Sequence, residues 1–98
     1  MNITKKLDGT RLKIELSGRL DTNTSPELEK ELKKDLANIK SLTFDFEELM
    51  YISSAGLRVL LSTQKIMNKQ GEMIIKNVND LIMEVFDATG FTDILTIE

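Results

Sequence analysis

The order of its periodic segments constrains the fold of this chain more than any other feature. Residues 11–17 alternate strictly between polar and apolar side chains, as a half-buried strand does, and residues 42–46 alternate in the same way. Between them lies a stripe of leucines at intervals of four, typical of the buried side of a helix: Leu28, Leu32 and Leu36. Strands separated by helices favour a mostly parallel sheet with right-handed crossovers. We therefore predict a single α/β domain over residues 1–98.

Turn residues place further elements around this centre. Asp8–Gly9 is a hairpin signal, because both residues tolerate positive φ, and it predicts a first strand over residues 3–7. That hairpin would form the edge of a mixed sheet. Residues 47–53 are expected to be a loop. Further short strands are expected at residues 73–75 and 94–97. Three to four helices complete the prediction, and we place three of them at residues 25–37, 54–70 and 79–89.

Local signals define the ends and faces of these helices. Thr24 or Ser25 is the expected cap of the first helix, with Pro26 in its first turn. Gly71 is expected to end the second helix, and Leu81 is assigned to the buried side of the third. The strict alternation of the two central strands indicates that one face of the sheet is thinly covered.

Charge and composition limit the classes of partner. The formal net charge is −3, and the basic residues are mostly interleaved with acids. Non-specific nucleic-acid binding needs clustered Lys and Arg, so we expect no nucleic-acid partner. No apolar run approaches the roughly 20 residues that span a bilayer, and the N-terminal residues lack the apolar stretch of a secretory signal. Without cysteine there is no disulfide framework. These observations favour a cytoplasmic protein with no membrane partner.

The residues that enzymes use for catalysis are sparse in this chain. It has no histidine, no phosphate-binding glycine loop and no zinc-protease motif, and no base lies near Ser53 or Ser54 in the sequence. Asp21 and Asp45, expected near strand ends, could bind a metal, and Glu47–Glu48 could act as an acid–base pair. Exposed carboxylates without an ion are the commoner outcome for such residues. We therefore expect no catalytic residue, no metal site and no cofactor.

Residues 51–61 are the segment most informative about function. Ser53 and Ser54 stand where a strand gives way to an apolar helical run. Serine is a preferred N-cap because its hydroxyl accepts a hydrogen bond from a free amide of the first turn, and either serine can fill that position. A hydroxyl at the positive end of a helix is also a place where a phosphate is favoured. Gly56, inside the helix, indicates close approach of a core strand or of a partner.

The same segment resembles the STAS domain, a family named for sulfate transporters and anti-sigma factor antagonists. In its small bacterial members, a loop of Asp or Ser, then Ser, a small residue, Gly and Leu carries the serine that is phosphorylated. Ser54 matches that serine, and Ser53 stands where many members have Asp. Residues 18–21 and 86–91 match further family elements in the same order.

This resemblance implies a STAS-like fold and a stand-alone anti-sigma factor antagonist. The unphosphorylated form would bind an anti-sigma factor that is itself an ATP-using serine kinase, and so free the sigma factor. Phosphorylation of Ser54 would release the antagonist, and a separate serine phosphatase would reset it. Two alternatives stay open. One is an interaction module without a phosphorylation switch, in a signalling scaffold or as the cytoplasmic subunit of a lipid transporter. The other is a hydrolase that depends on Ser54.

The partner surface can be predicted from the ends of the strands. Loops that follow parallel strands meet at one edge of the sheet. We therefore expect the loop after the second strand to join the start of the second helix in one surface, formed by Asp21, Thr22, Asn23, Ser53, Gly56, Leu57 and Arg58.

Overall fold

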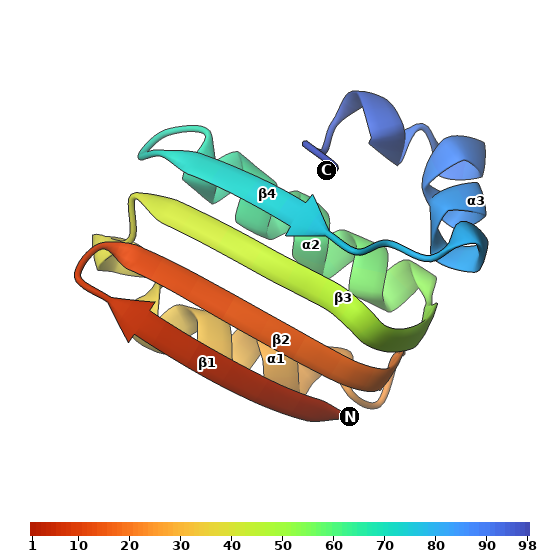
Figure 1. Ribbon diagram of the computed structural model, residues 1–98, viewed down its shortest axis with the longest axis horizontal. Helices are drawn as coiled ribbons and strands as arrows, with labels where there is room; N and C mark the ends of the chain where they lie inside the picture. The colour runs from red at the N-terminus through yellow and green to blue at the C-terminus, as the bar shows by residue number, and fades with distance from the viewer.

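Four strands form one mixed sheet in the computed structural model, which describes residues 1–98. In their order across the sheet they are β1 (Asn2–Asp8), β2 (Arg11–Leu20), β3 (Ser41–Ile52) and β4 (Glu72–Lys76). β1 pairs antiparallel with β2, whereas β2–β3 and β3–β4 are parallel pairs. The predicted mostly parallel sheet, with the N-terminal hairpin at its edge, is confirmed (Figure 1).

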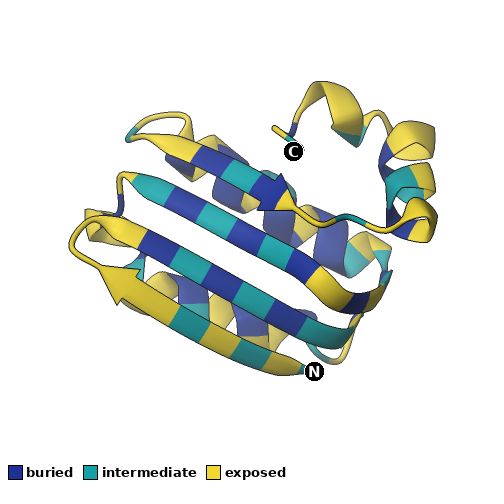
Figure 2. Cartoon of the chain, viewed as in Figure 1, coloured by how far each residue is buried: buried dark blue, intermediate teal, exposed yellow.

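Two helices cover one face of this sheet and leave the other face open (Figure 1). They are α1 (Ser25–Asp35) and α2 (Ser54–Met67), and α1 continues into a short 3₁₀ turn, η1 (Leu36–Asn38). The third helix, α3 (Asp80–Thr89), lies at the end of the sheet and is followed by η2 (Phe91–Asp93). Burial alternates along β2 and the first part of β3, so the thinly covered face is also confirmed (Figure 2).

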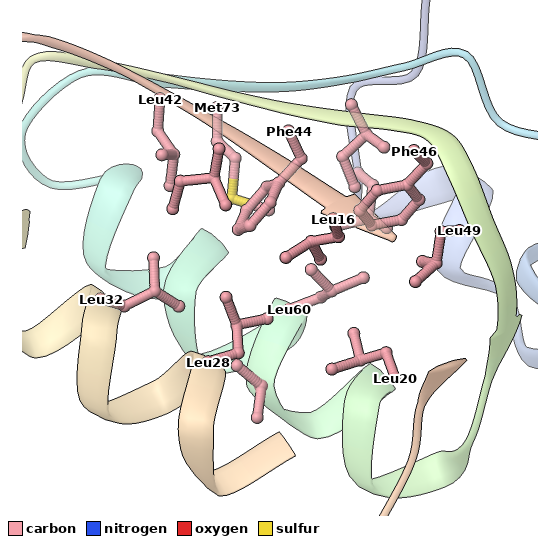
Figure 3. Close-up of a cluster of buried hydrophobic side chains, with 14 of the residues drawn as sticks. Leu16, Leu20, Leu28, Leu32, Leu42, Phe44, Phe46, Leu49, Leu60 and Met73 are labelled. Atoms are coloured by element: carbon pink, nitrogen blue, oxygen red, sulfur yellow. The ribbon is translucent and has the colours of Figure 1, made fainter. Parts of the chain in front are cut away.

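The core lies between the sheet and the two covering helices. Leu28 and Leu32 of α1 and Leu60 of α2 point toward Phe44 and Phe46 of β3 (Figure 3). All five side chains are at most 3% exposed, so the predicted leucine stripe does form the packed side of α1. Truncating one such side chain to alanine typically costs 2–5 kcal/mol.

A three-residue ion cluster attaches the edge hairpin to α1. Lys5 Nζ lies 2.8 Å from Glu31 Oε2 and 2.9 Å from Asp35 Oδ2, and all three side chains are about three-quarters buried. Lys5 pairs with Ile14, so its side chain points to the helix-covered face. A charged residue on an edge strand also discourages pairing with other chains.

β3 is longer than the sequence pattern predicts. Residues 47–52 were expected to be a loop, and this prediction is wrong, because β3 runs to Ile52 alongside β2. The paired register shifts between Glu15 and Ser17 and again beside Gly18, whose φ is +91°. Despite these irregularities, the pairing of β2 with β3 continues beyond the exposed acids of β3, and its last pair is Leu20 with Ile52. The end of β3 therefore lies directly before the start of α2.

The predicted last strand at residues 94–97 is also wrong. The chain makes a single parallel bridge there, between Ile75 and Ile97, with Ile75 N–H donating to the Thr96 carbonyl at 2.9 Å. The preceding residues turn instead: Leu95 N–H donates to the Phe91 carbonyl at 2.8 Å, and Leu95 is 6% exposed. Anchoring of this turn in the core leaves too few residues to form a strand.

The end of α2 differs from its prediction. The helix ends at Met67 rather than residue 70, and Gly71 has no positive φ, so it is not a left-handed cap. Gly71 is required for another reason, because a Cβ there would overlap the carbonyl oxygen of Lys40.

Two further local predictions need correction. Leu81 is 55% exposed, because Ile82 and Phe86 carry the packing of α3. In the hairpin, only Gly9 has a positive φ, at +62°, while Asp8 remains the last residue of β1. α3 begins at Asp80, one residue after the predicted start, and Asn79 is its N-cap.

Candidate partner-binding and modification site

The ends of β2 and β3 and the start of α2 are joined at one edge of the sheet. Leu20 and Ile52 are the final residues of their strands and pair with each other. The next residue, Ser53, donates its backbone N–H to the Leu20 carbonyl at 2.9 Å. The two segments predicted to share a surface therefore both leave the sheet at this edge (Figure 1).

Ser53 is the N-cap of α2, which settles the alternative that the sequence left open. Its backbone is extended (φ −101°, ψ 176°), and its hydroxyl accepts from Gly56 N–H at 3.4 Å. Its carbonyl accepts from Leu57 N–H at 3.0 Å. Ser54 is the first helical residue; its side chain is exposed and has no hydrogen-bond partner within the protein. Ser53 thus caps the helix, whereas the hydroxyl of Ser54 makes no hydrogen bond within the protein.

Gly56 and Leu57 belong to the core rather than to the exposed surface. A Cβ on Gly56 would lie 2.8 Å from Leu20 Cγ and 2.8 Å from Ile52 Cγ1, closer than real Cβ contacts allow. Leu57 is 7% exposed. These residues hold the start of α2 against the strand ends, so they position the site without offering side chains to a partner.

Asp21 caps the turn that leads into α1. Its Oδ1 accepts from the N–H groups of Asn23 at 3.0 Å and Thr24 at 3.1 Å, and its carbonyl accepts from Ser25 N–H at 2.8 Å. The hydrogen bond from Thr24 N–H is the main reason that the pKa of Asp21 is lower than usual. Thr24 does occupy the N-cap position of α1, one of the two predicted, but its side chain makes no capping bond. Thr24 Oγ1 instead donates to the Arg19 carbonyl at 2.7 Å, and Ser25 Oγ donates to the Asp21 carbonyl.

Thr22 and Arg58, from the two predicted segments, both line one hollow between α1 and α2. This inter-helix hollow encloses about 360 Å³. It is lined by Thr22, Ser25, Pro26, Glu29, Ala55, Arg58, Val59 and Ser62. Of the predicted partner residues, Thr22, Asn23 and Arg58 are exposed, and Asp21 and Ser53 are half-buried. Ser54, the predicted phosphorylation site, is exposed as well.

Three residues near this edge were given no firm role from sequence. Arg19 stacks on the Tyr51 ring, with the guanidinium carbon 4.0 Å from the ring centroid, and the two residues face each other across β2 and β3. Met50, next to Tyr51, is 70% exposed. The signal for the Arg19–Tyr51 pair is the strand register, which depends on two irregularities that the sequence did not reveal.

The carboxylates considered for metal or acid–base chemistry are not gathered together. Asp45 lies within β3 rather than at its end, and its Oδ1 accepts from Asn77 Nδ2 and from Glu47 N–H, each at 3.0 Å. The bond from Asn77 is the main cause of its lowered pKa. No group of three or more Asp, Glu, His or Cys side chains is arranged to hold a metal ion. None of the helices has the length and apolar character needed to cross a membrane.

Comparison with known proteins identifies the family. The anti-sigma-B factor antagonist of Bacillus subtilis (strain 168) is 26% identical over 98 residues, covering 99% of this chain and 90% of that protein. The anti-sigma factor antagonist SpoIIAA in its unphosphorylated form superposes with a TM-score of 0.79 at 17% identity, covering 99% of this chain and 87% of SpoIIAA. The phosphorylated form of the Bacillus cell fate determinant SpoIIAA superposes with a TM-score of 0.78 at 17% identity, covering 99% of this chain and 91% of that protein. The family model of the STAS domain matches residues 2–98, and the chain therefore belongs to the STAS domain family.

Proposed function

We propose that this protein is an anti-sigma factor antagonist whose binding is switched off by phosphorylation of Ser54. The unphosphorylated form binds an anti-sigma factor that is an ATP-using serine kinase, and binding frees the sigma factor in the cytoplasm. A serine phosphatase reverses the modification. The protein is then a substrate and a binder, not an enzyme. Relatives that match over nearly the whole chain bear the name anti-sigma-B factor antagonist, which supports the proposal.

The observation that carries the proposal is the state of Ser54. Its hydroxyl is exposed, free of hydrogen bonds and adjacent to the cap, so modification requires no break in the structure. In the proposed step, Ser54 Oγ bonds to the γ-phosphorus of ATP bound by the kinase. The bond from that phosphorus to ADP breaks, and a base of the kinase takes the hydroxyl proton. The protein supplies only the nucleophile.

Electrostatics explains how the phosphate could act without unfolding the domain. A phosphoserine adds about −1.5 to −2 charge at neutral pH. At the first position of α2 this charge meets the positive end of the helix, a contribution of about 0.3–1 kcal/mol in its favour. In a partner interface the same charge costs several kcal/mol if no cation matches it. Since each 1.4 kcal/mol is a tenfold change in affinity, phosphorylation weakens binding without reshaping the domain.

Mass spectrometry after incubation with the candidate kinase and ATP tests the modification. We expect one phosphate, on Ser54, in the wild type and in Ser53→Ala, and none in Ser54→Ala. Ser54→Ala should bind the kinase constitutively, and Ser54→Asp should bind at least tenfold more weakly than wild type. A phosphate on Ser53 or Thr22 would contradict the site. Tight binding without any modification would favour a STAS interaction module that has no switch.

Substitutions that preserve the fold test the partner surface. Asn23→Lys and Arg58→Glu change exposed side chains on the two segments, and each should weaken partner binding. Lys65→Glu, exposed farther along α2, is the matched control for Arg58→Glu. All three variants should keep their unfolding free energy within roughly 0.5 kcal/mol, as surface changes usually do. If Arg58→Glu and Asn23→Lys both bind like Lys65→Glu, the interface lies elsewhere.

A further inference from the structure

Ser54 and Arg58 occupy one side of α2, four residues apart. Residues at this spacing are neighbours on a helix surface. Helical side chains also lean toward the N-terminus, so a long side chain covers the turn that precedes its own Cα. Ser54 is the first residue of α2 and both side chains are exposed. The Arg58 guanidinium can therefore reach over the Ser54 hydroxyl without a change in the backbone.

Arg58 has no acidic partner of its own. No carboxylate oxygen lies within 4.0 Å of its guanidinium, whereas most other cations near α1 and the sheet are paired. Glu29 is the acid that lines the same inter-helix hollow, and it lies 3.7 Å from Lys33 on its own helix. Asp21, which precedes Thr22 in the chain, accepts hydrogen bonds from backbone N–H groups, and its carboxylate lies 3.7 Å from Arg19 Nε. The guanidinium of Arg58 thus forms no ion pair within the domain.

We propose that Arg58 is the internal counter-ion of a phosphate on Ser54. The inference rests on the proposed function only for the modification of Ser54. Arginine binds phosphate oxygens through parallel N–H donors, a geometry that a serine phosphate one turn away can meet. Phosphorylation then changes the partner surface twice: it adds negative charge at Ser54, and it withdraws Arg58 from contact with the partner.

A phosphoserine placed genetically at position 54 tests this pairing without any kinase. The second ionisation of the phosphate, ordinarily near pH 6, is followed by ³¹P NMR at physiological ionic strength, about 0.15 M. Three phosphorylated proteins are compared: the wild type, Arg58→Gln and Lys65→Gln. The last two lose the same charge from the same helix. Residue 65 is 11 positions from Ser54, roughly 16 Å along the axis and beyond the screening length in physiological salt.

A nearby cation favours the doubly charged phosphate, so its second pKa should be lower in the wild type. We expect a pKa difference of roughly 0.15–0.4 between wild type and Arg58→Gln, which corresponds to the roughly 0.2–0.5 kcal/mol of helix pairs at this spacing. Lys65→Gln should match the wild type. Equal values in wild type and Arg58→Gln, or an equal rise in both variants, would overturn the proposal. Because the phosphate is installed genetically, this result is independent of whether the natural partner modifies Ser54.

Discussion

Replacing each of the two adjacent serines at the start of α2 by alanine should change the free energy of unfolding by clearly different amounts. Ser53 accepts a hydrogen bond from Gly56 N–H, whereas the Ser54 hydroxyl is free and exposed. Replacing an N-cap serine by alanine costs about 0.5–2 kcal/mol. The distance of 3.4 Å is long for an N–H to oxygen bond, so the low end of that range applies. We expect Ser53→Ala to cost about 0.5–1 kcal/mol and Ser54→Ala less than about 0.5 kcal/mol.

Thermal unfolding followed by circular dichroism measures this difference. For a domain of this size, each kcal/mol shifts Tm by roughly 4–8 °C, so Ser53→Ala should melt about 2–8 °C below wild type. Ser54→Ala should melt close to wild type. Ser53→Gly is a useful control, because glycine tolerates the cap conformation and costs only a few tenths of a kcal/mol. A larger loss in Ser54→Ala than in Ser53→Ala would show that the cap has been assigned to the wrong serine.

Three further predictions concern packing and pH. Gly56→Ala should destabilise by about 1–2 kcal/mol in denaturant titration, because the overpacking cost against two buried side chains exceeds the helix-propensity gain; a stabilised variant would contradict the packing. Gly71→Ala should cost at least about 2 kcal/mol in the same assay, since its Cβ meets the backbone carbonyl of Lys40 rather than a movable side chain; a cost below that of Gly56→Ala would refute this. The pKa of Asp45 is lowered in the fold, so its stabilisation is present above its ordinary value of 3.8 and is lost as the pH falls through the lowered value. Asn77→Gly keeps the left-handed backbone but removes the main hydrogen bond to Asp45, so its stability should fall less than that of wild type between pH 7 and pH 2, and an equal fall would argue against this bond as the cause.

The arrangement of the sheet and its covering helices was predictable because burial imposes a period on the sequence. The leucine stripe of α1 and the alternation in β2 each record which side faces the core. The C-terminal segment misled for the same reason. Its apolar residues suggest a strand, yet Leu95 is buried by a turn and the segment pairs with β4 only through the single bridge between Ile97 and Ile75. The length of β3 depended on register irregularities beside Gly18, which arise from pairing with β2 and leave no local pattern.

The site was predictable in its location but not in the role of each residue. Loops after parallel strands had to meet, and they do so around Ser53 and the Asp21 loop. The choice between Ser53 and Ser54 as cap depends on one pair of backbone angles, and adjacent serines have equal propensity for it. We predicted Asp21 as part of the partner surface. Its carboxylate instead caps the turn that precedes α1, and the sequence pattern does not reveal that turn. Lysine at this position should therefore destabilise the fold as well as affect binding.

The close contact of Gly56 with Leu20 and Ile52 has a consequence for how this domain can diversify in evolution. The contact joins two strand ends to the helix that carries Ser54, so these three positions should change together or not at all among paralogues. The exposed positions of the neighbouring loop, such as Thr22 and Asn23, are under no such joint constraint. A duplicated gene could then acquire a new partner through a few exposed substitutions while inheriting the same switch. Several such domains could then operate in one cell, each binding its own partner because only their exposed residues differ.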